Sequence, residues 1–243
     1  MEGAASGGFG YNASGLRICA GKEGNHTMFT LPEEFLLLAV HEAKGTFFGS
    51  AVERMKAGLA GAILAELALA GNIHATPNHR LQLVDDGLVQ DDLLGKVIGA
   101  VKEEEKERKF GFWLAALGQK AEKYQGKIVE SLIHKGVFTQ DDERLQWVIP
   151  SPLQPEVKAS TKYLVVRRLR SIALAQETCE KRDLVLLSLV RACDLLDLVF
   201  LRDERKLADS YIYEQLFGRA ISDPLLQTVQ EIDAAVAAAV EED

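Results

Sequence analysis

The chain has 243 residues, of which 47% are hydrophobic and 26% are charged, and its formal net charge is −8. These averages exclude a mostly disordered or fibrous protein, and the length suits one large domain or two small ones. No apolar run reaches the roughly 20 residues that cross a bilayer. We expect no signal peptide, because no cationic stretch precedes an apolar one, and no disulfide framework, because the three cysteines are widely spaced. A soluble, cytoplasmic protein is expected.

The N-terminal part divides into an arm and a first helix. Residues 1–26 are rich in Gly, Ala and Ser without a sustained hydrophobic period, which predicts a flexible arm and places the domain at residues 27–243. The segment TLPE at residues 30–33 combines a helix cap, a proline for the first turn and a capping-box carboxylate. Residues 35–40 are almost wholly apolar, which predicts a helix buried on most sides.

A second helix is expected over residues 52–70, where apolar residues recur at spacings of three and four. Gly58 and Gly61 leave room on this helix for close packing of a neighbour, at some cost in helix propensity. Gly71 suits the left-handed conformation that ends a helix.

Two short strands and a third helix are expected next. Apolar residues at Ile73 and at residues 81–84, on either side of a Pro-Asn turn, predict two paired strands. Asp91 starts a further helix, and we interpret the charged run at residues 102–109 as its solvated end.

The remaining chain is predicted to be a helix, a hairpin and a helical C-terminal part. Residues 120–134 form the helix, and residues 137–149 form a β-hairpin whose tip, residues 140–144, is charged. Beyond a proline-rich connection, apolar spacings of three and four predict helices over residues 158–176, 182–200, 204–217 and 223–240. The sequence therefore predicts a mainly α protein with a single domain.

Motifs for catalysis and for metal binding are missing from the sequence. No P-loop, dinucleotide fingerprint, nucleophile elbow or paired zinc-ligand motif is present. His74 and His79 are close in sequence, but no further ligands stand nearby. Asp194 and Asp197 could serve acid–base chemistry, yet no nucleophile or third partner is evident, so we favour structural pairing with arginines. We expect no enzyme, no cofactor and no metal.

Positive charge gathers at three places, in spite of the acidic balance. Arg54 and Lys56 come before or at the start of the second helix, Lys120, Lys123 and Lys127 share one arc of a later helix, and residues 167–170 carry three arginines. Each group alone is typical of a solvated helix face. Two groups that converged would form a pocket for a phosphorylated headgroup.

Four segments, taken in order, resemble the Golgi phosphoprotein 3-like family. They are TLPEEFLLLAVH at residues 30–41, GLAGAILAELALAGNI at residues 58–73, LIHKGVF at residues 132–138, and residues 184–207 with Asp194. The resemblance implies a central helical bundle wrapped by amphipathic helices, with a projecting β-hairpin. It further implies a non-enzymatic peripheral membrane adaptor that binds phosphatidylinositol 4-phosphate, and the pattern suggests a divergent, bacterial member.

The headgroup residues that the resemblance implies are replaced in this chain. The family's tryptophan falls near residues 50–51, its first arginine falls on Ala60, and two helix arginines fall on Glu122 and Gln125. Loss of these contacts should weaken phosphate binding severely, since each charge-assisted hydrogen bond contributes roughly 1.5–3 kcal/mol. The adjacent residues predicted to bind a shifted headgroup are Arg54, Lys56, Lys123 and Lys127, with Phe48 beside them.

The hairpin also departs from the eukaryotic pattern, because its tip is charged instead of apolar. Leu145, Trp147 and Val148 remain as candidates for contact with lipid or with a second subunit. From the resemblance we expect an anionic phospholipid as partner, at the cytoplasmic face of a membrane. The alternative is a protein-interaction module that has lost lipid binding and forms homo-oligomers through the hairpin.

A winged-helix nucleic-acid binder, with residues 137–149 as the wing, ranks last. The acidic tip at residues 141–143 would face phosphates with the wrong sign of charge. No nucleic acid is expected as a partner.

Overall fold

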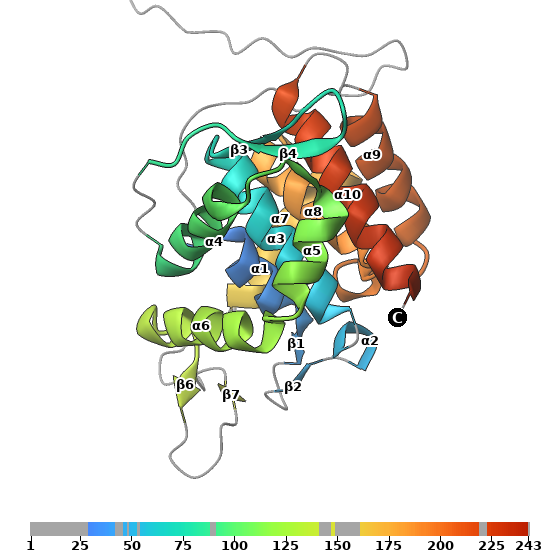
Figure 1. The fold of residues 1–243 in the computed structure, drawn as a ribbon. Coiled ribbons are helices and arrows are strands. Elements are labelled where there is room, and N and C mark those ends of the chain that lie inside the picture. The colour runs from blue at the N-terminus through green and yellow to red at the C-terminus, as the bar shows by residue number, and fades with distance from the viewer. Residues whose placement is uncertain are drawn as a thin grey trace, which may run out of the picture.

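The computed structural model describes residues 29–41, 46–47, 49–52, 54–87, 91–140, 147–148, 161–218 and 223–242. It is mainly helical, as predicted, and its helices form a single domain (Figure 1). The predicted arm at residues 1–26, Phe48 and Leu145 lie outside the described residues. In the part that is described, no helix is both long and apolar enough to cross a membrane.

Helix α3 (Met55–Leu69) occupies the centre of the bundle and is buried along most of its length. It packs against α1 (Leu31–Ala39), α5 (Phe110–Gly118), α8 (Lys181–Ala192) and α10 (Pro224–Glu242) (Figure 1). A helix that is apolar on all sides needs such neighbours. The predicted central bundle is confirmed.

Two glycines of α3 make this packing close, as predicted. A Cβ atom at Gly58 would lie 2.2 Å from Cζ of Phe35 on α1, and one at Gly61 would lie 2.6 Å from Cγ2 of Val236 on α10. Ordinary contacts between carbon atoms are about 3.5–4.0 Å. Only hydrogen fits at these two positions. Gly71, with φ of 79°, follows α3 in the left-handed conformation that its sequence predicted.

Amphipathic helices cover the bundle. Helices α4 (Asp92–Glu103) and α6 (Ala121–His134) each bury an apolar face and expose the opposite, mostly polar face. Helices α7 (Thr161–Ala175) and α9 (Arg205–Phe217) complete the C-terminal half. The short helix α2 (Gly49–Val52) follows strands β1 (Val40–His41) and β2 (Thr46–Phe47), which pair with each other.

A small antiparallel sheet joins β3 (Ile73–Ala75), β4 (Arg80–Leu83) and β5 (Arg108–Lys109). The first two strands were predicted. Most of residues 102–109 are exposed, as predicted, but their assignment to the end of the helix is wrong, because α4 ends at Glu103 and the last two residues pair with β4. Arg80 Nη1 also donates to the carbonyl oxygen of Glu107 over 2.6 Å, which holds this segment against the sheet.

The helix predicted over residues 182–200 is shorter in the structure. Helix α8 ends at Ala192, and Asp194 takes a left-handed φ of 52° before the short 3-10 helix Leu196–Leu198. The Leu195 N–H donates to the Val190 carbonyl over 2.9 Å, the bond that closes a left-handed helix end. The continuous helical spacing of the sequence therefore hides a turn.

The predicted hairpin is confirmed as a strand pair. In β6 (Thr139–Gln140) and β7 (Trp147–Val148), Thr139 lies opposite Val148 and Gln140 opposite Trp147. The pair projects below α6 in Figure 1. Residues 141–146, which include the charged tip, lie outside the described residues. The role of Leu145, Trp147 and Val148 in lipid or subunit contact stays a prediction.

Candidate functional site

The four predicted cations do not line a single pocket. Arg54, Lys56 and Lys127 line three different pockets. Lys123 is exposed on α6, one turn before Lys127. The convergence on which a shared headgroup site depended is therefore absent among these residues.

Arg54 is held by the turn that follows α8. Its Nη1 donates to the Asp194 carbonyl oxygen over 2.7 Å, and its Nη2 lies 3.0 Å from Oδ2 of the same residue. The pocket beside this pair has mixed charge, since it is lined by Asp197, Asp209, Arg205 and Lys206 as well. The interpretation of Asp194 as the partner of an arginine is confirmed, with Arg54 as that partner. Its local acids make this pocket a poor site for a phosphate.

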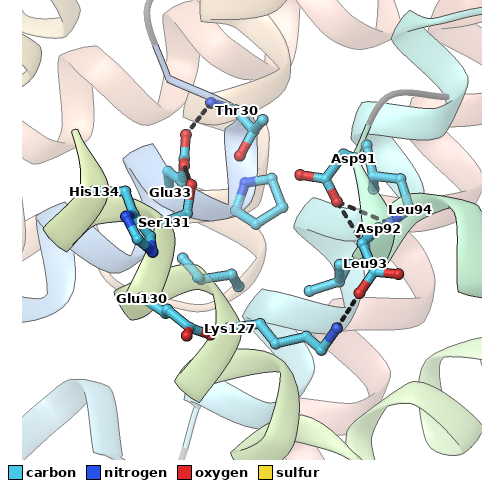
Figure 2. Close-up of a pocket in the computed structure, with 12 residues that line it drawn as sticks. Thr30, Glu33, Asp91, Asp92, Leu93, Leu94, Lys127, Glu130, Ser131 and His134 are labelled. Atoms are coloured by element: carbon cyan, nitrogen blue, oxygen red, sulfur yellow. Dashed lines mark hydrogen bonds and ion pairs between the residues drawn. The ribbon is translucent and has the colours of Figure 1, made fainter.

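Lys127 belongs to a pocket of about 330 Å³ at the starts of α1 and α4 and along α6. Figure 2 shows its side chain reaching Asp92, with which it forms an ion pair. Hydrogen bonds from Lys127 and Lys96 lower the pKa of the Asp92 carboxyl to about 2. The charge of Lys127 is therefore balanced by a carboxylate that stays ionised at neutral pH.

Two further acids of this pocket, Asp91 and Glu33, have structural partners (Figure 2). Asp91 Oδ1 accepts from the N–H groups of Leu93 and Leu94 over 2.8 and 3.0 Å, which caps α4. Glu33 accepts from the Ser131 hydroxyl over 2.7 Å and from the Thr30 N–H over 2.6 Å. We find no group of three metal-ligating side chains within the described ranges. Asp91 and Glu33 therefore act at helix ends, where they cap α4 and tie the start of α1 to α6.

Lys56 lines a larger groove, of about 920 Å³, between α5 and α10. These two helices lie side by side in Figure 1, with β4 near the start of α5. The rim carries Lys56, Arg80, Arg108 and Lys109. We call this feature the basic groove.

The rim of the basic groove is strongly positive. Its lining contains one carboxylate, Glu231, which lies 2.6 Å from Nδ1 of His79. Arg108 is paired with Glu104 at 3.0 Å. Lys56 and Lys109 are exposed and form no ion pair within the part of the chain that the structure describes. Two lysines are thus available to an anion from outside.

The floor of the basic groove is apolar. It consists of small side chains of both helices and of two larger ones at the base, namely Gly111, Ala115, Gly118, Ala234, Ala235, Ala238, Ala239, Phe110 and Leu114. Phe112 stands in the lining with 44% of its surface exposed, and the Arg108 guanidinium carbon lies 5.0 Å from the centre of its ring. The groove therefore pairs a cationic rim with an apolar base, in a protein whose net charge is −8.

The positions that the resemblance assigned to the headgroup have other surroundings. Ala51 is fully buried, and Ala60 is 2% exposed. Glu122 is exposed on α6, so a negative charge stands where the resemblance predicts an arginine. These residues offer no cation to a phosphate.

A comparison with protein families decides the identity of the fold. The model of the family described as Golgi phosphoprotein 3 (GPP34) matches residues 31–241. The chain belongs to the Golgi phosphoprotein 3 family. The match covers nearly the whole chain and includes every helix of the bundle from α1 to α9, so the resemblance seen in the sequence segments is confirmed.

Three rim residues of this Golgi phosphoprotein 3 protein were missed from the sequence. Arg80 was not singled out, and Arg108 and Lys109 were interpreted as part of a solvated helical end. The signal that could have found them is the position of Arg108 and Lys109 directly before an apolar aromatic segment, residues 110–114. A basic pair beside an aromatic side chain that is exposed, as Phe112 is, suits a surface that meets an amphiphile.

Proposed function

We propose that this protein is a peripheral membrane adaptor that binds anionic phospholipids, of the phosphoinositide class, through the rim of the basic groove. The Golgi phosphoprotein 3 family is not known as an enzyme family, and the proposed role needs no catalysis. The observation that carries the proposal is the set of four cations, Lys56, Arg80, Arg108 and Lys109, which line one groove with a single carboxylate. The proposed headgroup site therefore differs from the positions that the family resemblance assigns to the headgroup.

Electrostatics support this choice of surface. Each Lys or Arg near an anionic membrane contributes about 1 kcal/mol of attraction. The two lysines without an ion pair give about 2 kcal/mol, a factor of roughly 30 in the binding constant. The acidic remainder of the chain would be repelled, so the groove would face the bilayer.

The proposal is tested by sedimentation of the full chain with vesicles. The vesicles contain phosphatidylcholine alone, or phosphatidylcholine with phosphatidylserine, or with phosphatidylinositol 4-phosphate. We expect binding to the two anionic compositions only, stronger to the one with phosphatidylinositol 4-phosphate, and loss of most of it in the double variant Lys56→Glu/Lys109→Glu. Both side chains are exposed, so the variant should keep its fold.

A matched control carries the same change of charge elsewhere. Arg202 and Lys206 are exposed and lie outside the lining of the basic groove, so we expect Arg202→Glu/Lys206→Glu to bind as the wild type does. A third variant, Lys123→Glu, tests the originally predicted face of α6. Equal weakening in the two double variants, with about half that loss of binding free energy in Lys123→Glu, would mean that net charge alone governs binding, and would reject the basic groove as the site.

A further inference from the structure

We propose that the basic groove holds one anionic amphiphile in a defined way, with its apolar chain along the α5–α10 floor and its phosphate at the β4–β5 end. This inference rests on the proposed function, since it names the ligand of the same site. It goes further in one respect: an isolated lipid monomer should bind through its chain as well as through its headgroup.

The size and lining of the groove suit one small amphiphile. Sites for single small molecules measure roughly 300–1,000 Å³ and are mostly apolar with a few placed polar groups. The basic groove has about 920 Å³, an alanine and glycine floor, and Phe112 as an exposed aromatic wall. A peptide helix needs separate pockets for side chains at helical spacing, whereas this floor is lined by alanine and glycine, which suits an alkyl chain.

The charges define the end at which the head would lie. Arg80 and Lys109 are directly opposite each other in the β4–β5 ladder, and Arg108 is the next residue along. Helix α5 begins at the next residue, Phe110, so its N-terminal backbone N–H groups add positive potential at the same end. Three cations and a helix start therefore gather at one end of the alanine floor.

The alkyl chain of the ligand would be recognised only through its apolar contact with the floor of the groove. Methylene groups that leave water gain about fourfold in binding each when fully covered. A groove open to solvent covers a chain on one side, so we expect about twofold per methylene, and about fourfold for each step of two carbons.

The test is calorimetric titration of the full chain with methyl, octyl, decyl and dodecyl phosphate, each below its micelle concentration. We expect affinity to rise by about fourfold from octyl to decyl and again to dodecyl phosphate. The floor variant Ala115→Leu/Ala238→Leu fills the channel from two exposed positions and should abolish this rise. The control Ala100→Leu/Ala175→Leu makes the same change at exposed positions on α4 and α7 and should bind as the wild type does.

The outcomes separate this inference from the proposed function. Equal affinity for all chain lengths, together with binding to anionic vesicles, would overturn the chain site and leave the membrane role intact. A chain-length series without any vesicle binding would keep the chain site and reject the membrane role. If an acidic helical peptide bound instead of the alkyl phosphates, or if the floor variant split a dimer in sedimentation velocity, the groove would be a protein interface and the inference would be wrong.

Discussion

Glu34 and Arg168 form an ion pair inside the helical bundle. Arg168 Nη2 lies 2.8 Å from Oε1 of Glu34, whose side chain is 1% exposed, and Arg168 Nε lies 2.8 Å from Oδ1 of Asp183. One guanidinium thus joins α1, α7 and α8. Burial raises the pKa of both carboxyls above their ordinary values, although the arginine opposes this shift.

Replacement of Arg168 should be among the most damaging changes in the chain. Arg168→Met leaves two buried carboxylates without their shared partner, and breaking a buried pair in this way costs about 3–5 kcal/mol. We expect a loss of this size in the free energy of unfolding, measured by urea denaturation at pH 7. Arg167→Met is the matched control, because that side chain is exposed on the same helix, and it should change stability by less than about 0.5 kcal/mol.

Asp233 should make the stability of the protein depend on pH. Burial against α8 raises the pKa of this carboxyl from 3.8 to about 6, although Arg191 lies 3.2 Å away. Between pH 4 and 6 the unfolded chain has already lost this proton while the folded protein still holds it. The contribution of Asp233 to stability therefore falls as the pH rises through this window, by about 3 kcal/mol in all, and is constant above it.

The measurement compares the wild type with Asp233→Asn in denaturant between pH 3.5 and 7.5. The unfolding free energy of the wild type minus that of the variant should fall steadily from pH 4 to 6 and then level off. A difference that is flat over this range would show that Asp233 is ionised in the folded protein at pH 4.

The elements of the fold followed from local patterns, but the site did not. Helix α3 was predictable because its spacing, its two close-packing glycines and Gly71 all agree. The turn at Asp194 was not predictable, because an aspartate in the left-handed conformation does not interrupt the apolar spacing of the sequence around it. The meeting of Lys56 with Lys109 in one groove depends on how α5 packs against α10 and α3, a tertiary relationship that no local spacing records.

Two glycine-to-alanine changes should have opposite effects. At Gly58 a Cβ would lie 2.2 Å from the ring of Phe35 and 3.1 Å from Sγ of Cys193, so Gly58→Ala forces α1 and α3 apart. Overpacking costs about 1–3 kcal/mol, which exceeds the roughly 1 kcal/mol gained in helix propensity. At Gly99 on α4 no atom lies within 4 Å of the added carbon, so Gly99→Ala should stabilise the protein by about 0.5–1 kcal/mol.

Thermal unfolding of both variants, monitored by circular dichroism, checks this pair. A lower midpoint for Gly58→Ala and a higher one for Gly99→Ala are expected. A higher midpoint for Gly58→Ala as well would show that backbone propensity outweighs packing at the centre of the bundle.

Lys56 and Lys127 were predicted as partners in one site, and the structure gives them different roles. Lys127 is neutralised by Asp92, whereas Lys56 is exposed at the rim of the basic groove. Lys56→Met should weaken binding to anionic vesicles by about fivefold, the equivalent of about 1 kcal/mol. Lys127→Met should leave vesicle binding unchanged and change stability little, as for other ion pairs at the surface. If Lys127→Met weakened vesicle binding more than Lys56→Met does, the headgroup site would lie at α6, and Asp92 would have to release its lysine to the lipid.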